Sequence, residues 1–352
     1  MEQTYFEWLN TSTPTRWWHD SANPDEIERG IERGALGVTT NPVLTYRTFL
    51  TDPDFWKDEV DKIPDDLSPE ENAEALLRLV ATYAAGKFTD VFEKTGGIHG
   101  LALGQLNPDR AGDAEGMLAQ ARRVHSWGDN IAVKLPTTNA GLEVIESLAE
   151  ECIPICATLN VSVAQAIDVA EAYEKGAAKA KAEGRKPALC LVVQQVGRLD
   201  DYLRDVAKDM KAEVLESDIQ QAGIAMCKRT YKIFRERNYS SYIMPAGLRN
   251  IEQVTEMAGG EKITFTLQPR IQDMVLAANP EKVVKIDNPV AEDVIERLMT
   301  IPEFVRAYEP NAFKREEYIR FGVMQKLLSQ FMETGWAPLE TYGSALKSSR
   351  WF

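Results

Sequence analysis

Lys134 has a side chain and a sequence environment that suit nucleophilic catalysis. It lies in the segment NIAVKLPTT, where apolar neighbours predict a buried strand. Burying an ammonium group is costly, and desolvation leaves more of a buried amine in its neutral, nucleophilic form. Such an amine can form a Schiff base with a carbonyl compound. A structural ion pair with Asp20 or another acid explains a buried lysine at this position equally well.

Other polar side chains end the remaining short apolar runs of the sequence. In parallel α/β proteins the carboxyl ends of the strands meet at one face, which is where active sites form. Taken alone, these residues also fit a helix cap, an Asn-Pro turn, a β-branched strand position or plain surface cations. The two arginines together favour an anion site, because guanidinium groups offer a fork of donors. The residues are Asp20, Asn41, Gln105, Thr158, Gln195, Arg198 and Arg249.

The elements that would position these residues alternate between strand-like and helical patterns. Short apolar runs predict eight strands, near 14–19, 36–39, 100–106, 130–135, 153–158, 188–194, 241–245 and 263–266. Helical periodicity separates them, at 24–33, 113–126, 139–150, 161–183, 199–236 and 250–259. This alternation calls for parallel crossovers and favours closure into a (β/α)8 barrel, with an open doubly wound sheet as the alternative. We expect a barrel domain over residues 1–270 with a helical insertion around 51–95, and a C-terminal helical extension over 271–352.

Composition narrows the function classes. A net charge of -14 argues against a general nucleic-acid surface. No apolar run reaches the roughly 20 residues that span a bilayer, and the first 15 residues lack the pattern of a secretion signal. Four cysteines without a CxxC pair predict reduced thiols in a cytoplasmic protein. Three dispersed histidines predict no metal site, and the missing G-x-G-x-x-G argues against a dinucleotide cofactor.

Four sequence strings carry a family resemblance. GVTTNP (37–42), VKLPTTNAGLEVI (133–145), VGRLDD (196–201) and GLRN (247–250) stand on predicted strand ends. In this order and spacing they resemble the transaldolases and the related fructose 6-phosphate aldolases, over most of residues 14–266. The resemblance implies a class I aldolase TIM barrel that needs no cofactor, with Lys134 as the Schiff-base lysine.

The resemblance also implies a role for each of the other residues. Asp20 would shuttle the proton of the hydroxyl whose carbon–carbon bond breaks, and Thr158 would hold the water of imine formation and hydrolysis. Asn41 would bind the lysine-linked substrate, while Arg198 and Arg249 would bind a phosphate. The implied partner is a small sugar phosphate substrate, and we expect binding to neither nucleic acid nor membranes. A homo-oligomer is compatible with the sequence.

Departures from the family pattern concentrate around the lysine. Gln105 stands where transaldolases carry a glutamate, whereas the fructose 6-phosphate aldolases also carry a glutamine there. An amide cannot accept a proton as a carboxylate does. Gln195 replaces an aromatic residue and Val193 a nearby serine. Cys156 replaces an asparagine and Gly247 a serine of the phosphate site. We therefore expect a changed substrate or a changed balance between transfer and cleavage.

Three functional hypotheses follow from the sequence. The leading one is a Schiff-base transaldolase or aldolase that transfers or releases a three-carbon ketone unit from a phosphorylated ketose. The second is a transaldolase-like barrel that has lost catalysis and acts in binding or regulation. The third is a transaldolase whose sugar carries a non-phosphate anionic tail, such as a sulfonate or a carboxylate.

Overall fold

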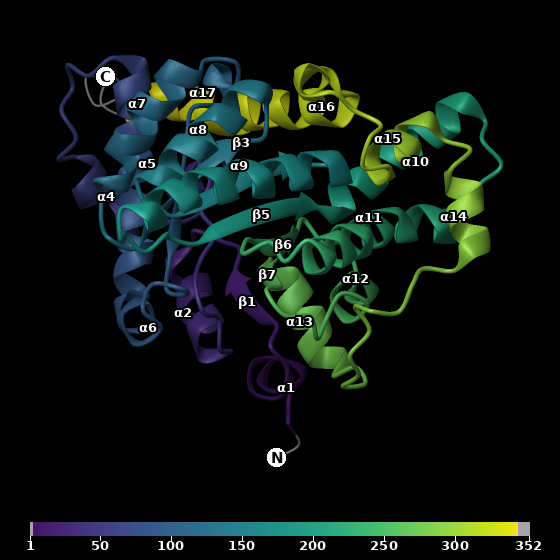
Figure 1. The fold of residues 1–352 in the computed structure, drawn as a ribbon. Helices are drawn as coiled ribbons and strands as arrows, with labels where there is room; N and C mark the ends of the chain where they lie inside the picture. Colours follow the sequence, from purple (N-terminus) through teal and green to yellow (C-terminus); the bar gives the residue numbers. More distant parts are fainter. Residues whose placement is uncertain (1–2, 344–352) are drawn as a thin grey trace.

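Parallel strands occupy the middle of the molecule in a computed structural model that describes residues 3–343 (Figure 1). Five of them form one sheet in the order β2-β3-β4-β5-β6, and β1 pairs with β7. Isolated bridges link His19 to Val38, Val38 to Ala102, and Ile243 to Ile263, directly before β7. The strands are β1 (Arg16–His19), β2 (Ala102–Gln105), β3 (Ile131–Pro136), β4 (Ile155–Asn160), β5 (Cys190–Gln195), β6 (Tyr242–Ala246) and β7 (Thr264–Leu267).

The strand predicted at 36–39 is reduced to the single bridging residue Val38. The amide of Val38 donates to the carbonyl of Leu101, and the amide of Thr39 donates to the carbonyl of His19. The chain then reaches Pro42, which has no amide hydrogen and begins a helix. The segment therefore has room for little ladder pairing before the helix starts.

Helices surround the strands and most begin shortly after a strand ends. A side-chain oxygen caps many of these starts by accepting a backbone N–H, as Asn23, Thr138 and Ser162 do. The helices that follow strands or Val38 are α2 (Pro24–Glu32), α3 (Pro42–Thr51), η1 (Pro108–Arg110), α7 (Ala114–His125), α8 (Asn139–Glu150), α9 (Val163–Ala182), α10 (Val196–Met210), α11 (Glu216–Glu236), α12 (Ile251–Thr255) and α13 (Pro269–Ala278).

The helical pattern predicted over 199–236 is two helices rather than one. Lys211 adopts a left-handed backbone conformation with φ of 55° and ends α10. An extended connection then leads into α11 at Glu216. Side-chain periodicity continues across this break, and a non-glycine residue gives no sequence signal for a left-handed C-cap.

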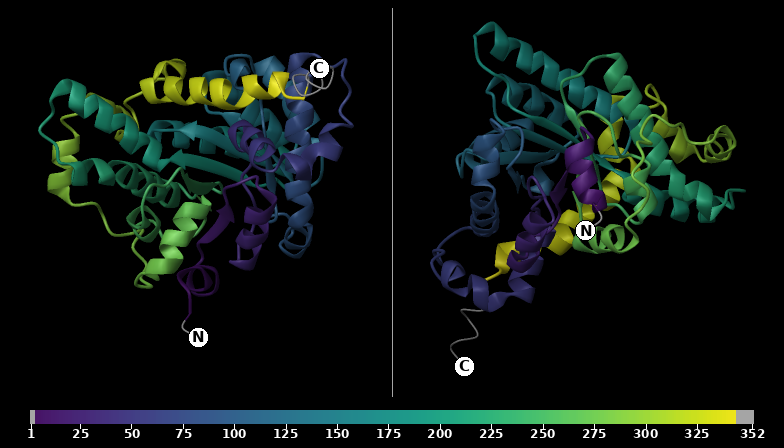
Figure 2. Two further views of the ribbon diagram at one scale, coloured as in Figure 1. Left: turned by 180° about the vertical axis from the view of Figure 1, so that it is seen from behind. Right: turned by 90° about the horizontal axis from the view of Figure 1, so that it is seen from below.

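Two helical segments lie outside this alternation. Residues 51–95 hold α4 (Pro53–Val60), α5 (Pro69–Lys87) and α6 (Thr89–Lys94), while α1 (Tyr5–Ser12) precedes β1. After α13 the chain forms α14 (Glu292–Leu298), α15 (Pro302–Tyr308), η2 (Arg315–Arg320), α16 (Gly322–Phe331), the π-helical turn η3 (Met332–Trp336) and α17 (Ala337–Thr341). The last helices lie at the opposite end of the molecule from α1 (Figures 1 and 2). Residues 344–352 of the predicted extension lie outside the described residues.

Apolar side chains of the strands fall into two buried clusters. One cluster joins side chains of six strands, including Trp18, Leu103, Cys156, Val193 and Met244. A larger cluster lies between the strands and their helices. Among residues 3–343 no helix has the length and apolar character needed to cross a membrane.

Candidate active site

Lys134 projects from the middle of β3 with a nearly buried side chain that is 4% exposed. Its neighbours in register are Gln105 on β2 and Cys156 on β4. Across the described residues, no hydrogen bond or ion pair engages its amine, so the predicted alternative of a closed ion pair with Asp20 is absent. The amine is therefore buried and unengaged.

Asp20 follows β1 directly, and its backbone N–H donates to the carbonyl of Leu267 at 3.0 Å. Burial raises the pKa of its carboxyl to about 6, against the lowering effect of the Lys134, Arg198 and Arg47 charges. A carboxyl that titrates in this range can accept a proton and return it near neutral pH. The structure thus brings the predicted proton carrier into electrostatic contact with the predicted nucleophile.

Three further predicted residues lie on the strands β2, β4 and β5. Thr158 on β4 is 1% exposed, and its hydroxyl accepts a long hydrogen bond of 3.5 Å from the amide of Gln195, the last residue of β5. The side-chain oxygen of Gln105 is buried and has no hydrogen-bond partner in the described chain. Buried polar atoms are normally satisfied, so this oxygen is available to a ligand or a water.

Asn41 is the N-cap of α3. Its side-chain oxygen accepts from the amide of Leu44 at 3.0 Å. This bond commits the oxygen and leaves the NH2 group as the donor that can face a substrate.

Arg198 and Arg249 converge at Gly247. A Cβ at that glycine would lie 3.3 Å from Oε1 of Gln195, 3.5 Å from Cγ of Arg198 and 3.9 Å from Nη1 of Arg249. Burial and the neighbouring Arg249 charge lower the pKa of Arg198, whose guanidinium forms no hydrogen bond or ion pair within residues 3–343. Two close cations, one of them unpaired within residues 3–343, together attract an anion electrostatically.

Arg249 is held in place by several groups. Its Nε and Nη2 donate to one carboxylate oxygen of Asp201 at 3.0 and 2.8 Å, and its Nη1 donates to the carbonyl of Gly247 at 2.6 Å. Its backbone N–H donates to Gln253, whose amide donates in turn to Asp200. The guanidinium is thereby oriented, and Asp201 offsets much of its charge.

Sequence reasoning missed Arg47, Asp201 and Gln253. Asp201 lies in the VGRLDD string, close to the predicted Arg198, but nothing in the sequence indicated that it would pair with Arg249. Arg47 lies in the second turn of α3, where an exposed cation gives no signal. Gln253 acts from a short helix after β6, and a sequence pattern does not reveal such a contact.

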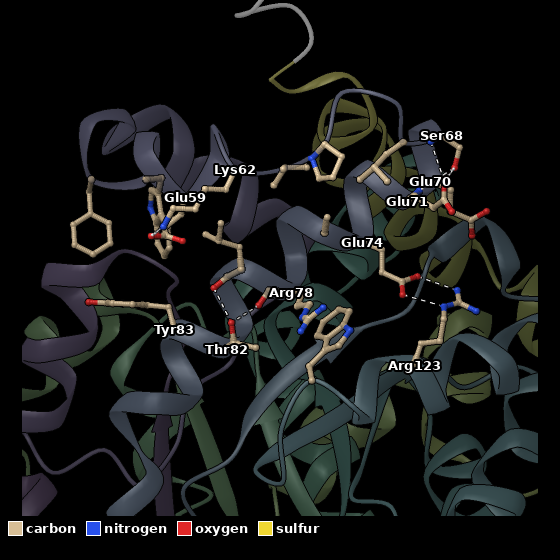
Figure 3. A pocket seen from close by; sticks show the side chains of 18 residues that line it. Glu59, Lys62, Ser68, Glu70, Glu71, Glu74, Arg78, Thr82, Tyr83 and Arg123 are labelled. Carbon is tan, nitrogen blue, oxygen red and sulfur yellow. Dashed lines mark hydrogen bonds and ion pairs between the residues drawn. The ribbon is translucent and has the colours of Figure 1, made fainter.

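A large surface hollow lies elsewhere. It has a volume of about 1360 Å³ and lies beside α4 and α5. Figure 3 shows Glu74 facing Arg123 there, with two hydrogen bonds of 3.1 and 2.9 Å. None of the eight predicted site residues lines this hollow, so it is separate from the candidate site.

Comparison with known proteins identifies the family. Residues 17–307 match the family described as transaldolase/fructose-6-phosphate aldolase. The chain belongs to this family. A transaldolase of Neisseria meningitidis serogroup A is 29% identical over 226 residues, which cover 61% of this chain and 62% of the relative. The transaldolase of Thiobacillus denitrificans is 28% identical over 229 residues, covering 62% and 64%.

A third family relative is aligned over more of its length. A probable transaldolase of Dehalococcoides mccartyi is 28% identical over 240 residues, covering 68% of this chain and 80% of that protein. The Neisseria and Thiobacillus alignments span less than two thirds of the length of those relatives. At these identities the family is clear, while substrate choice rests on individual residues.

Proposed function

We propose that this chain is a transaldolase or aldolase that binds a ketose as a Schiff base on Lys134 and transfers or releases a three-carbon ketone unit. The observation that carries the proposal is the unengaged, buried amine of Lys134 beside a carboxyl, that of Asp20, whose pKa lies near 6. A buried amine without a partner destabilises the fold, and such groups are found most often at functional sites.

The proposed architecture is a closed (β/α)8 barrel with Val38 as the reduced second strand. The order of pairing supports it, because β7 pairs with β1, and bridges connect β1 to Val38, Val38 to β2, and β6 to the residue before β7. All of these pairs are parallel. In such a barrel Lys134 and Asp20 point into one mouth.

The proposed reaction begins at the ketose carbonyl. The amine of Lys134, once deprotonated, attacks this carbon, and the resulting carbinolamine takes up a proton and loses water to give an iminium ion. Thr158 and Gln195, whose side chains contact each other, would hold that water. Asp20 then takes the proton of the C4 hydroxyl as the C3–C4 bond breaks, and the bond's electron pair moves into the iminium to give an enamine. An aldehyde is the leaving product.

The fate of the enamine decides between transfer and release. Attack on an aldehyde acceptor gives a new ketose, whereas protonation and imine hydrolysis release a free ketone. The unpartnered oxygen of Gln105 lies next to Lys134 and would accept a hydrogen bond from the water of hydrolysis. Because an amide cannot take the proton from that water, Gln105 would orient it while Asp20 handles the proton.

Borohydride trapping tests the proposal. We expect reduction in the presence of fructose 6-phosphate, sedoheptulose 7-phosphate or dihydroxyacetone to add the mass of the reduced ketose or ketone to the peptide that contains Lys134. Lys228 is the internal control, because it is also buried but pairs with Glu256 at 2.8 Å. An unmodified Lys134 with all three compounds would refute the Schiff-base mechanism.

A second candidate keeps the chemistry and changes the anionic tail of the sugar to a sulfonate or a carboxylate. Asp201 already offsets the charge of Arg249, and Gly247 offers no hydroxyl to a phosphate oxygen. Both features suit a monoanion better than a dianion. Inhibition of trapping by inorganic phosphate but not by sulfate would contradict this candidate.

A role in binding or regulation without catalysis is the remaining alternative. The conjunction of Lys134, Asp20 and Thr158 in one buried site speaks against it. Turnover by the parent chain that disappears in Lys134→Ala would exclude it.

A further inference from the structure

The last helices of the described chain run across the face at which the strands end. We define the strap as Gly322–Thr341, which comprises α16, η3 and α17. Figures 1 and 2 show it in yellow, lying along one side of the strand and helix layers. Its first helix contacts α10, β4 and η1, its π-helical turn contacts α3 and η1, and its last helix contacts α5 and α3.

We propose that the strap positions Asn41 through the close contact of Gly335 with α3. The proposal rests on the proposed function, in which Asn41 binds the lysine-linked substrate. The strap reaches from α10, which carries Arg198, to α3, which Asn41 begins. It therefore connects the two elements that would hold opposite parts of a bound ketose.

Gly335 brings the strap tightly against the first turn of α3. A Cβ at Gly335 would lie 2.8 Å from the backbone nitrogen of Val43, and 2.9 and 3.0 Å from Cβ and the carbonyl carbon of Pro42. Atoms at these distances overlap, and two of the three belong to the backbone of a helix. Relief therefore requires the strap or the first turn of α3 to move.

Movement of that first turn changes the position of Asn41. Its side-chain oxygen caps α3 through the amide of Leu44, so its free NH2 group follows the orientation of the helix start. A displacement of about 1 Å in a substrate-positioning group can change a rate by about a hundredfold. Gly335 is thus a positioning residue that acts through α3.

The strap is anchored on both sides of Gly335. Before it, Met324 and Leu327 pack with Leu159 at the end of β4 in one buried cluster. After it, Trp336 is fully buried. The amide of Asn72 on α5 donates to the carbonyls of Leu339 at 2.8 Å and Tyr342 at 3.0 Å. These anchors fix the strap in place, and the π-helical turn between them resembles the local distortions that often mark functional sites.

Gly335→Ala and Gly112→Ala test the proposal as a matched pair. A Cβ at Gly112 meets nothing within 4 Å. The readout is the ketose concentration that gives half-maximal borohydride trapping, measured with fructose 6-phosphate or sedoheptulose 7-phosphate, whichever labels the parent chain. We expect an increase of about tenfold or more for Gly335→Ala and no change for Gly112→Ala. An unchanged value in a folded Gly335→Ala variant overturns the proposal.

Asn72→Ala keeps the proposal testable if Gly335→Ala does not fold. The matched control is Asn130→Ala, because Asn130 is also half-buried and donates to two carbonyls, those of Ala85 and Gly100, before β3 begins. We expect about a threefold increase in the half-maximal concentration for Asn72→Ala and none for Asn130→Ala. Equal values for both variants would overturn the role of the strap.

The two proposals fail in different ways. If the parent chain forms no adduct with any of the ketoses, the proposed function falls and the inference about the strap falls with it. If the parent chain forms the adduct and the strap variants bind ketose as the parent does, only the inference about the strap is refuted.

Discussion

Replacing Asp20 with asparagine should stabilise the protein while it removes the proposed activity. Burial raises the pKa of this carboxyl from 3.8 to about 6, so the folded protein disfavours the charged form. A carboxyl with a raised pKa lowers the free energy of unfolding as pH rises between the two values, and below both values it has no effect. Asparagine has a similar shape and carries no charge, so it avoids this cost.

The size of the effect follows from the two pKa values. At pH 7.5 the ionised Asp20 costs about 3 kcal/mol, because each unit of pKa shift corresponds to about 1.4 kcal/mol. At pH 5.0 the cost falls to roughly half of that, since most of the carboxyl in the folded protein is then protonated. The stabilisation by Asp20→Asn should therefore be roughly twice as large at pH 7.5 as at pH 5.0.

Urea unfolding at the two pH values measures this difference, and aldol cleavage of free ketose in the absence of borohydride measures activity. Asp218→Asn is the control, because Asp218 is also buried but pairs with Arg297 at 2.8 Å, which lowers its pKa. Its stabilising contribution is present above the unfolded-state pKa, so that variant should be less stable at pH 7.5. Destabilisation by Asp20→Asn, or a stabilisation independent of pH, would refute the assigned state of Asp20.

Other expected outcomes concern the same site. The pH profile of ketose cleavage should rise through an apparent pKa of about 6, because Asp20 must be ionised to accept a proton; a profile that is flat from pH 5 to 8 would contradict this role. Asp201→Asn should weaken ketose binding by about tenfold with little change in kcat, because Arg249 loses its orienting partner; isothermal titration with a substrate analogue checks this. Lys134→Met should raise the melting temperature while it abolishes adduct formation, since a buried, unpaired amine is removed; a lower melting temperature would mean that the amine has a partner when the site is empty.

Much of the site was visible in the sequence because strand ends carry it. Lys134 and Thr158 stand on strands whose apolar neighbours give a strong local signal, and Asp20 follows such a strand directly. The structure places Lys134 in register with Gln105 on β2 and Cys156 on β4, and Thr158 lies two residues beyond Cys156. The strand positions were visible in the local pattern, whereas the preference for a catalytic over a structural lysine came from the family resemblance.

The rest depends on contacts between segments that are distant in sequence. Val38 loses most of its strand because Pro42 begins a helix four residues later. The left-handed Lys211 divides a helical pattern that periodicity alone continues. Asp201 orients Arg249 across 48 positions, and Gly335 meets α3 across almost the whole chain. Local propensity contains no information on such contacts, so they appear only in the structure.

The same chain contains both ways of burying a lysine, and the contrast bears on function. Lys228 is 7% exposed, and its ammonium group donates to Glu256 and to the carbonyl of Asn288, each at 2.8 Å. That is how a structural lysine offsets its desolvation. Lys134 is more deeply buried, at 4% exposed, yet Asp20 nearby forms no ion pair with it within the described chain. The fold therefore pairs one buried lysine with two hydrogen-bond acceptors and leaves the other lysine without one in the described chain. Leaving Lys134 open is consistent with a partner that arrives from solution, and a carbonyl compound is the partner that an amine of this kind can bind covalently.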